Sequence, residues 1–203
     1  MHPNRAFDWT DEEEMLSFVA DQSFAHIFAA SDAGLFVVHA PVVVTGEGRI
    51  QFHVSRRNRI ADQLNGHTAL VSIVGREAYH SANWYASANQ VPTWHYEAVE
   101  VEGAAHRLSD EQLIDLLDRL STKMEERYSP ERPWTRAKME AGRFEAMTKA
   151  IVGFEIGSFT IRGTRKFNQH KQGEDLGATI AGQRAAGRDD IVAAVEELVR
   201  RAQ

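Results

Sequence analysis

A short basic segment is the first place in this sequence where binding chemistry can be expected. Ser55-Arg56-Arg57-Asn58-Arg59 follows an alternating run that predicts a strand, and it precedes residues 60–64, which predict a short helix. Guanidinium, hydroxyl and amide groups donate hydrogen bonds to anions, and a helix N-terminus adds unpaired amides. The segment therefore indicates a phosphate-binding turn. The alternative is a solvated basic turn whose arginines pair with nearby carboxylates.

A second candidate site is an aromatic stretch over residues 80–96. Trp84, Tyr85, Trp94 and Tyr96 stand there among serine, asparagine and threonine side chains. Flat rings with polar rims suit a planar heteroaromatic ligand. Taken one at a time, each aromatic residue is explained as well by a plug in a barrel or a subunit interface.

Two further sets of residues carry polar or metal-binding side chains. Residues 165–171 end the last predicted strand with cationic and amide side chains, which could reach the same ligand. The nine histidines are scattered, with neither a His-Glu-x-x-His motif nor a close His-x-His pair, so no metal site is expected.

The elements that must position these residues are mostly short antiparallel strands. Apolar and alternating patterns predict strands at 24–29, 35–44, 49–54, 68–74, 78–80, 91–94 and 96–105, and a terminal hairpin from 150–156 and 159–167. Capping boxes at Thr10 and Ser109 begin two predicted helices, the first with an inward stripe of Met15, Phe18 and Val19. This pattern predicts an α+β, mainly β fold: a Greek-key-like antiparallel barrel with added helices.

Three other segments are predicted from weaker signals. A helix is expected over residues 135–148, and residues 168–188 read as a mobile tail or linker. Residues 189–202 form an amphipathic helix whose apolar stripe needs a partner, either the barrel or a second subunit. We therefore expect one domain over residues 1–167, followed by a tail at 168–203 that is not an independent domain.

The composition narrows the function classes. The net charge of −6 makes a DNA-binding module less expected, and no helix-turn-helix pattern is present. A mean hydropathy of −0.40 and the lack of a basic, apolar leader predict a cytoplasmic protein without membrane spans. The chain has no cysteine, which excludes disulfides, thiolate metal sites and thiol nucleophiles.

Several of these motifs match one known family. The most specific are Tyr79-His80-Ser81-Ala82-Asn83-Trp84-Tyr85 and Val91-Pro92-Thr93-Trp94-His95-Tyr96; Gly103, His53-Val54 with Asn58, residues 150–156 and residues 166–171 add to them. The chain resembles the PaiB-like proteins, described as FMN-binding negative transcriptional regulators with the FMN-binding split-barrel fold. Ala82 stands where that family has proline, and His95 where it has asparagine. Asn168 and His170 replace a serine and an asparagine.

The resemblance implies a cofactor, a partner and a set of roles. It implies a homodimer that binds FMN, with the phosphate held by Ser55, Arg56, Asn58 and Arg59. Trp84, Tyr85, Thr93 and Trp94 would flank the isoalloxazine ring, and Lys166 and Gln169 would close the pocket.

Three other functions remain open at this point. One is an FMN-dependent oxidoreductase acting on a small molecule. Another is a haem-binding relative with His170 as the axial ligand. The third is regulation by direct contact with DNA, which is less expected than regulation through a protein or a metabolite.

Overall fold

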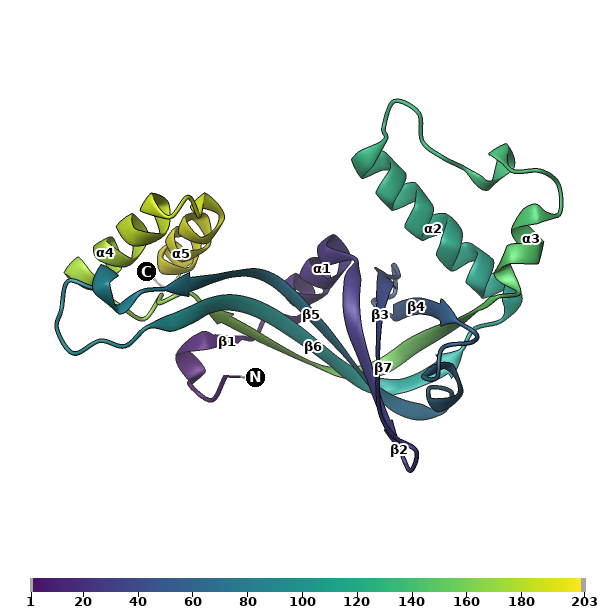
Figure 1. The fold of residues 1–203 in the computed structure, drawn as a ribbon, viewed down its shortest axis with the longest axis horizontal. Helices are drawn as coiled ribbons and strands as arrows, with labels where there is room; N and C mark the ends of the chain where they lie inside the picture. Colours follow the sequence, from purple (N-terminus) through teal and green to yellow (C-terminus); the bar gives the residue numbers. More distant parts are fainter. Residues whose placement is uncertain (1, 202–203) are drawn as a thin grey trace. The chain divides into compact units, whose positions relative to one another are not determined.

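The computed structural model describes residues 2–201 and shows a mixed α+β fold around one sheet (Figure 1). Over these residues the strands are β1 (Asp8–Trp9), β2 (Phe24–Ser31), β3 (Gly34–Val44), β4 (Ile50–Ser55), β5 (His67–His80), β6 (Thr93–Arg107) and β7 (Ile151–Lys166). Their order is β1-β7-β4-β3-β2-β5-β6, and β7 also pairs with β6. All strands except β1 therefore close into a ring, as the sequence predicts.

The chain divides into two compact units. The barrel unit comprises Glu12–Ile73 and Glu100–Ile161, and the extension unit comprises Met1–Asp11, Val74–Val99 and Arg162–Gln203. The strands β5, β6 and β7 contribute residues to both units. Each unit has a core of its own.

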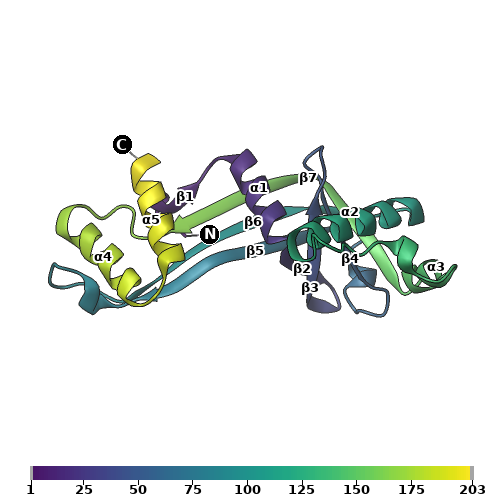
Figure 2. The ribbon, with the colours of Figure 1, turned by 90° about the horizontal axis from the view of Figure 1, so that it is seen from above.

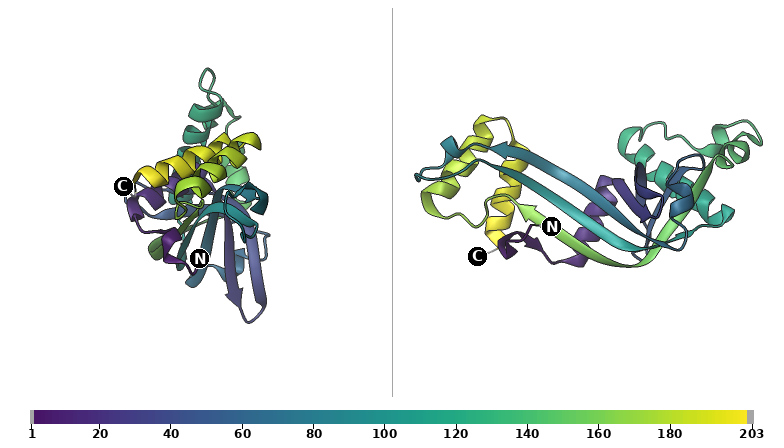
Figure 3. Two further views of the ribbon diagram at one scale, coloured as in Figure 1. Left: turned by 90° about the vertical axis from the view of Figure 1, so that its left-hand side faces the viewer. Right: turned by 60° about the horizontal axis from the view of Figure 1, so that its bottom comes forward.

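The barrel unit follows the sequence pattern closely. Ile50, Phe52 and Val54 alternate along β4 and are all buried, as period-two spacing requires. Gly34 has a φ of +118° in the turn between β2 and β3, whose hairpin is seen in Figure 3. Helix α1 (Glu12–Gln22) buries its expected stripe of Met15, Phe18 and Val19.

Helix α2 (Asp110–Tyr128) confirms the second capping box. The Ser109 hydroxyl accepts from the Gln112 amide at 3.2 Å, and the Gln112 side chain accepts from the Ser109 amide at 2.9 Å. Leu113 and Leu116 pack in a cluster with Val43 and Leu108. These contacts attach the helix to the strands of its own unit.

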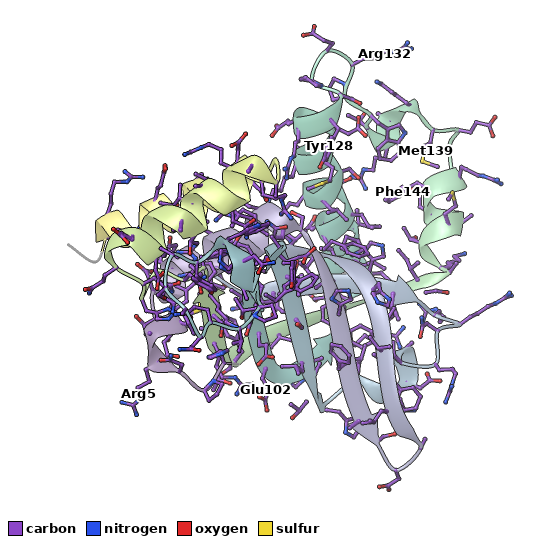
Figure 4. All side chains as sticks on the ribbon, turned by 60° about the vertical axis from the view of Figure 1, so that its left-hand side comes forward. Arg5, Glu102, Tyr128, Arg132, Met139 and Phe144 are labelled. Carbon is purple, nitrogen blue, oxygen red and sulfur yellow. The ribbon has the colours of Figure 1, made fainter. Side chains whose placement is uncertain are left out.

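The predicted helix over residues 135–148 is wrong. The structure has a single 3-10 turn, η4 (Arg136–Lys138), and then the short helix α3 (Arg143–Thr148). Gly142 adopts a φ of +75° between them, a left-handed conformation that ends any continuous right-handed helix. Figure 4 shows this connection, from Tyr128 at the end of α2 through Arg132 and Met139 to Phe144 on α3.

Two predicted strand breaks are also wrong. β5 runs without interruption through residues 75–77, and β7 is one strand rather than a hairpin broken near Gly157. No residue from 157 to 159 has a positive φ, so the chain stays extended there. The two ends of β7 pair with different strands, β4 at Ile151–Ile156 and β1 at Gly163–Thr164, which holds it extended.

The extension unit contains the largest departure from the sequence prediction. The expected mobile segment 168–188 instead forms helix α4 (Gly173–Ala185). It lies beside α5 (Asp189–Arg201), as Figures 1 and 2 both show. The expected end of the last helix at Ala202 lies outside the described residues. No helix among residues 2–201 is long and apolar enough to cross a membrane.

The apolar face of α5 packs against other residues of the extension unit. Ile191, Ala194 and Val195 are buried against Ala78 and Phe167, and Leu176, Ile180, Leu198 and Val199 pack around them. α4 itself buries the polar side chains of Thr179 and Gln183. Its inward face therefore mixes these two polar residues with Leu176 and Ile180, which weakens the apolar periodicity that would reveal the helix.

A buried carboxylate fixes the strands of the extension unit. Glu97 on β6 is 2% exposed and accepts from Arg76 on β5 at 2.7 and 3.1 Å. Arg165 on β7 lies 3.6 Å from the same carboxylate. Three neighbouring strands therefore meet at one desolvated charge, whose pairing is needed because an unpaired buried carboxylate is costly.

Candidate functional site

The basic turn after β4 is shaped by its own side chains. The Ser55 hydroxyl accepts from the Arg57 amide at 3.3 Å, and the Asn58 side-chain oxygen accepts from the Ile60 amide at 3.1 Å. The helix expected over residues 60–64 is only the 3-10 turn η2 (Ala61–Gln63). An anion at this turn would therefore depend on side chains rather than on a helix N-terminus.

Arg56 is already engaged within the barrel unit. Its guanidinium donates to the carbonyls of Lys149 at 3.0 Å and Ile151 at 2.8 Å, and its amide donates to Ala150 at 2.9 Å. These bonds fasten the turn to the start of β7. Arg56 consequently lines a different pocket, of about 420 Å³, with Asp110, Leu113, Ile114, Glu145, Thr148 and Lys149.

Arg57 and Arg59 face a pocket of their own. With Asn58 they line a cavity of about 470 Å³ whose other wall is Leu35, Phe36 and Val37. The Arg59 guanidinium lies 5.1 Å from the centre of the Phe36 ring. The Arg57 guanidinium makes no hydrogen bond or ion pair with any residue in the range 2–201. Arg57, Arg59 and the amide side chain of Asn58 thus line a cavity that could accept an anion.

The predicted ring-binding residues lie in the extension unit. Trp84 belongs to the 3-10 turn η3 (Ala82–Trp84), and the hydroxyl of Tyr85 accepts from the Asn168 side chain at 2.8 Å. The ammonium of Lys171 lies 5.0 Å from the centre of the Tyr85 ring. Both aromatic rings are partly exposed, so each retains a face for another group.

The remaining predicted residues of this unit differ in the hydrogen bonds that their side chains already make within the protein. Lys166 donates to the Thr93 hydroxyl at 2.7 Å, which brings these two together. Trp94 is 51% exposed and donates its indole N–H to Glu77. The Gln169 side chain accepts from Phe167 and donates to the carbonyls of Arg165 and Ala6, so it braces the chain rather than facing a ligand.

Two stacked histidines are buried beside these aromatic residues. His80 and His95 have no solvent exposure, and their rings lie 4.8 Å apart at 19°. The Gln183 amide nitrogen lies 3.4 Å from the Nδ1 atom of each and donates to the Tyr79 carbonyl at 3.1 Å. The Nε2 atom of each ring has no hydrogen-bond partner among the described residues.

Their surroundings keep both imidazoles neutral. Burial lowers the pKa of His80 to about 4, and the charge of Lys171 adds to the effect. Burial lowers the pKa of His95 to about 3, helped by His80 and Lys166 and opposed by Asn168. No group of three metal-ligating side chains occurs in the described part of the chain.

Comparison with known proteins decides the family. Residues 1–157 match the family described as "Putative FMN-binding domain". The chain belongs to this family. It is also 29% identical over 186 residues to the protease synthase and sporulation protein PAI 2 of Bacillus subtilis, which covers 86% of this chain and 85% of that protein. The resemblance to the PaiB-like FMN-binding family is thereby confirmed, and with it FMN as the expected cofactor.

Solved structures confirm the split-barrel fold. The flavocytochrome Anf3 from Azotobacter vinelandii aligns with a TM-score of 0.54 at 17% identity, covering 81% of this chain and 72% of that one. The FAD and heme binding protein from Mycobacterium smegmatis aligns with a TM-score of 0.55 at 15% identity, covering 86% and 78%. At these identities the likeness concerns the fold.

The residues of this FMN-binding domain fit the parts of a flavin mononucleotide. The cavity beside Arg57, Asn58 and Arg59 offers the donors that a phosphate needs. Trp84, Tyr85 and Trp94 offer ring faces, and Lys166 offers a cation beside Thr93. The two sets belong to different units of the chain and are described here as separate half-sites.

Sequence reasoning misses the role of Gln183. This residue lies in the segment expected to be a mobile tail, and nothing in the local sequence indicates that it reaches the histidine pair. The sequence does mark Arg57 in the basic turn and Asn168 in the polar strand end, but it does not separate Arg57 from Arg56 or indicate that Asn168 reaches Tyr85. His170, the expected haem ligand, is exposed and packs edge-on against Phe7.

Proposed function

We propose that this protein binds FMN as a homodimer and offers two separate half-sites: Arg57, Asn58 and Arg59 for a phosphate, and Trp84, Tyr85, Thr93, Trp94 and Lys166 for a flavin ring. The observation that supports it best is the pocket lined by Arg57 and Arg59, where the Arg57 guanidinium has no hydrogen bond or ion pair within residues 2–201. Ser55 contributes by shaping the turn, and Arg56 and Gln169 by bracing the backbone.

The direct test is a titration of FMN with the purified protein, in which the quenching of flavin fluorescence reports binding. Saturable quenching, or a yellow protein with the absorption bands of oxidised flavin, is the expected result. A colourless protein that does not quench FMN at any concentration would refute the cofactor assignment. A Soret band would point instead to haem.

The homodimer is supported by an apolar surface on the barrel unit. Phe24, Phe28, Leu35 and Val37 on the β2–β3 hairpin are between 40% and 87% exposed. Phe28, Leu35 and Leu70 line a groove of about 560 Å³. Leu35 and Phe36 also line the cavity beside Arg57 and Arg59, so a second copy seated on this hairpin would cover the same cavity.

The biological role we propose is regulatory. The support is the relation to the Bacillus protein named for protease synthesis and sporulation. When bound, FMN supplies electron or hydride transfer, and the protein orients it. Turnover of NADH or NADPH by the flavin-loaded protein would show that an FMN-dependent oxidoreductase is the better description. A cytoplasmic location stays a prediction, which fractionation of cells expressing the protein would check.

A further inference from the structure

The loop that carries the predicted ring-binding residues has little structure of its own. After η3, residues 85–92 form neither a helix nor a strand. Asn89 in this loop has a φ of +64°, an uncommon conformation for a residue with a side chain. A loop of this kind keeps one conformation only if other parts of the chain hold it.

The first support is the contact between Trp84 and Gly182 on α4. A Cβ atom placed at Gly182 would lie between 2.6 and 2.8 Å from side-chain atoms of Trp84. No side chain larger than hydrogen fits at this position unless Trp84 moves. The indole is therefore seated directly on the backbone of α4.

The second support lies one residue further along α4. The buried amide of Gln183 donates to the Tyr79 carbonyl at 3.1 Å and faces both rings of the stacked histidines. The His80 ring makes edge-to-face contacts with Trp84 and Tyr85, with centroid distances of 5.2 and 4.6 Å. Gln183 thus fixes the residues from which the loop departs.

The third support holds the far side of the loop. The Asp175 carboxylate accepts from the Ser87 amide at 2.8 Å and from the Ser87 hydroxyl at 2.7 Å. These bonds lower the pKa of Asp175, so it is ionised at neutral pH. Lys171 donates to the Gln90 side chain at 3.0 Å, and Gln90 in turn donates to the Ser87 hydroxyl.

We propose that residues 168–183 form a clamp that positions Trp84 and Tyr85 for the flavin ring. The clamp includes Asn168, which holds the Tyr85 hydroxyl, and it ends at Gly182 and Gln183. It lies beyond residue 157, where the match to the FMN-binding family ends. The ligand part of this inference rests on the proposed FMN function, whereas the holding of the loop does not.

A matched pair of glycine substitutions tests the clamp. Gly182→Ala places a methyl group against Trp84, whereas Gly177→Ala in the same helix meets nothing within 4 Å. Both changes favour the helix, so a difference between them reports the contact with Trp84. Gly182→Ala should weaken FMN binding about tenfold, the loss expected for one aromatic stacking contact. Gly177→Ala should bind FMN like the unchanged protein.

A second pair tests the other end of the clamp. Asp175→Ala removes both bonds to Ser87, and Glu174→Ala removes the same charge from an exposed neighbour. Asp175→Ala should weaken FMN binding, Asp175→Asn should restore part of it, and Glu174→Ala should leave it unchanged. Chymotrypsin cleavage after Trp84 and Tyr85, identified by mass spectrometry, measures the opening of the loop without any flavin.

The outcomes separate the clamp from the proposed cofactor. Faster cleavage together with weaker FMN binding in Gly182→Ala and Asp175→Ala supports the clamp. Faster cleavage with unchanged FMN affinity shows that the loop does not position the flavin and overturns the inference. Unchanged cleavage in both variants also overturns it. If the unchanged protein binds no FMN, the proposed function fails, and the cleavage rates alone decide whether the clamp holds the loop.

Discussion

At the residue scale, the adjacent arginines Arg56 and Arg57 have different roles in one turn. Arg56 donates to the carbonyls of Lys149 and Ile151, whereas the guanidinium of Arg57 lines the cavity that Arg59 shares. Neighbouring side chains in a tight turn point in different directions, so adjacency in sequence does not give them a common function. We therefore assign Arg57, and not Arg56, to the phosphate.

We expect Arg57→Ala to weaken FMN binding about tenfold or more while leaving the fold intact, since a hydrogen bond to a charged group contributes about 1.5–3 kcal/mol. Arg59→Ala should behave in the same way. Arg56→Ala should instead lower the free energy of unfolding and leave the affinity close to that of the unchanged protein. Fluorescence titrations and urea unfolding of the three variants check this. An Arg56→Ala protein that folds normally but loses FMN would contradict the assignment.

The buried histidine pair predicts an acid sensitivity. The pKa values of His80 and His95 lie at about 4 and about 3 in the folded protein, below the ordinary value of 6.5. The unfolded chain therefore binds protons first as the pH falls. Stability is therefore complete above pH 6.5 and decreases below it, down to about 4 for His80 and about 3 for His95, with each histidine contributing about 1.4 kcal/mol per pH unit within its window.

His95→Asn, which places the family's residue at this position, should flatten that decrease. Urea unfolding of both proteins at several values between pH 7 and 4.5 measures the slope. An identical slope in the variant would show that His95 is not the group that takes up the proton.

At the element scale, the close approach of β6 and β7 depends on Gly103. A Cβ atom there would overlap the Ser158 carbonyl oxygen and lie 2.6 Å from a methyl group of Ile156. The sequence marks this glycine only through its match to the family. The structure supplies the reason, which is that the strands closing the ring leave no room for a side chain.

Gly103→Ala should therefore lower the free energy of unfolding by about 1–3 kcal/mol, the usual cost of overpacking. Gly46→Ala is the matched control, since a Cβ atom at Gly46 meets nothing within 4 Å and its φ is not positive. Chemical denaturation of both variants gives the comparison. Equal stability would mean that the backbone of β7 moves away easily.

The elements show which predictions a local pattern can support. Alternation predicts β4, and capping residues predict the start of α2, because both signals lie within a few residues of the element they describe. The continuity of β7 depends on partners far along the chain, β4 and β1. The helix α4 mixes Thr179 and Gln183 with Leu176 and Ile180 on its inward face, so its apolar pattern carries only a weak helical signal.

At the scale of the whole molecule, the exposed β2–β3 hairpin is the surface we propose for self-association. Leu35→Lys should shift the protein from dimer to monomer, because burying an unpaired ammonium group at an interface is unfavourable. Met147→Lys is the control, at a residue of α3 that is 57% exposed and lies outside the hairpin. Sedimentation velocity measures both. A Leu35→Lys protein that remains dimeric would move the interface elsewhere.

The sequence alone determined the chemistry that this protein can offer and the family to which it belongs. The basic turn, the aromatic stretch and the alternating strands are local patterns, and each is visible within a few residues. Tertiary structure decided which of those groups are free. It committed Arg56 and Gln169 to backbone carbonyls, left Arg57 at the cavity, and joined Trp84 to α4. The physical reason is that a side chain's partners are chosen by packing between distant segments, which no local pattern contains.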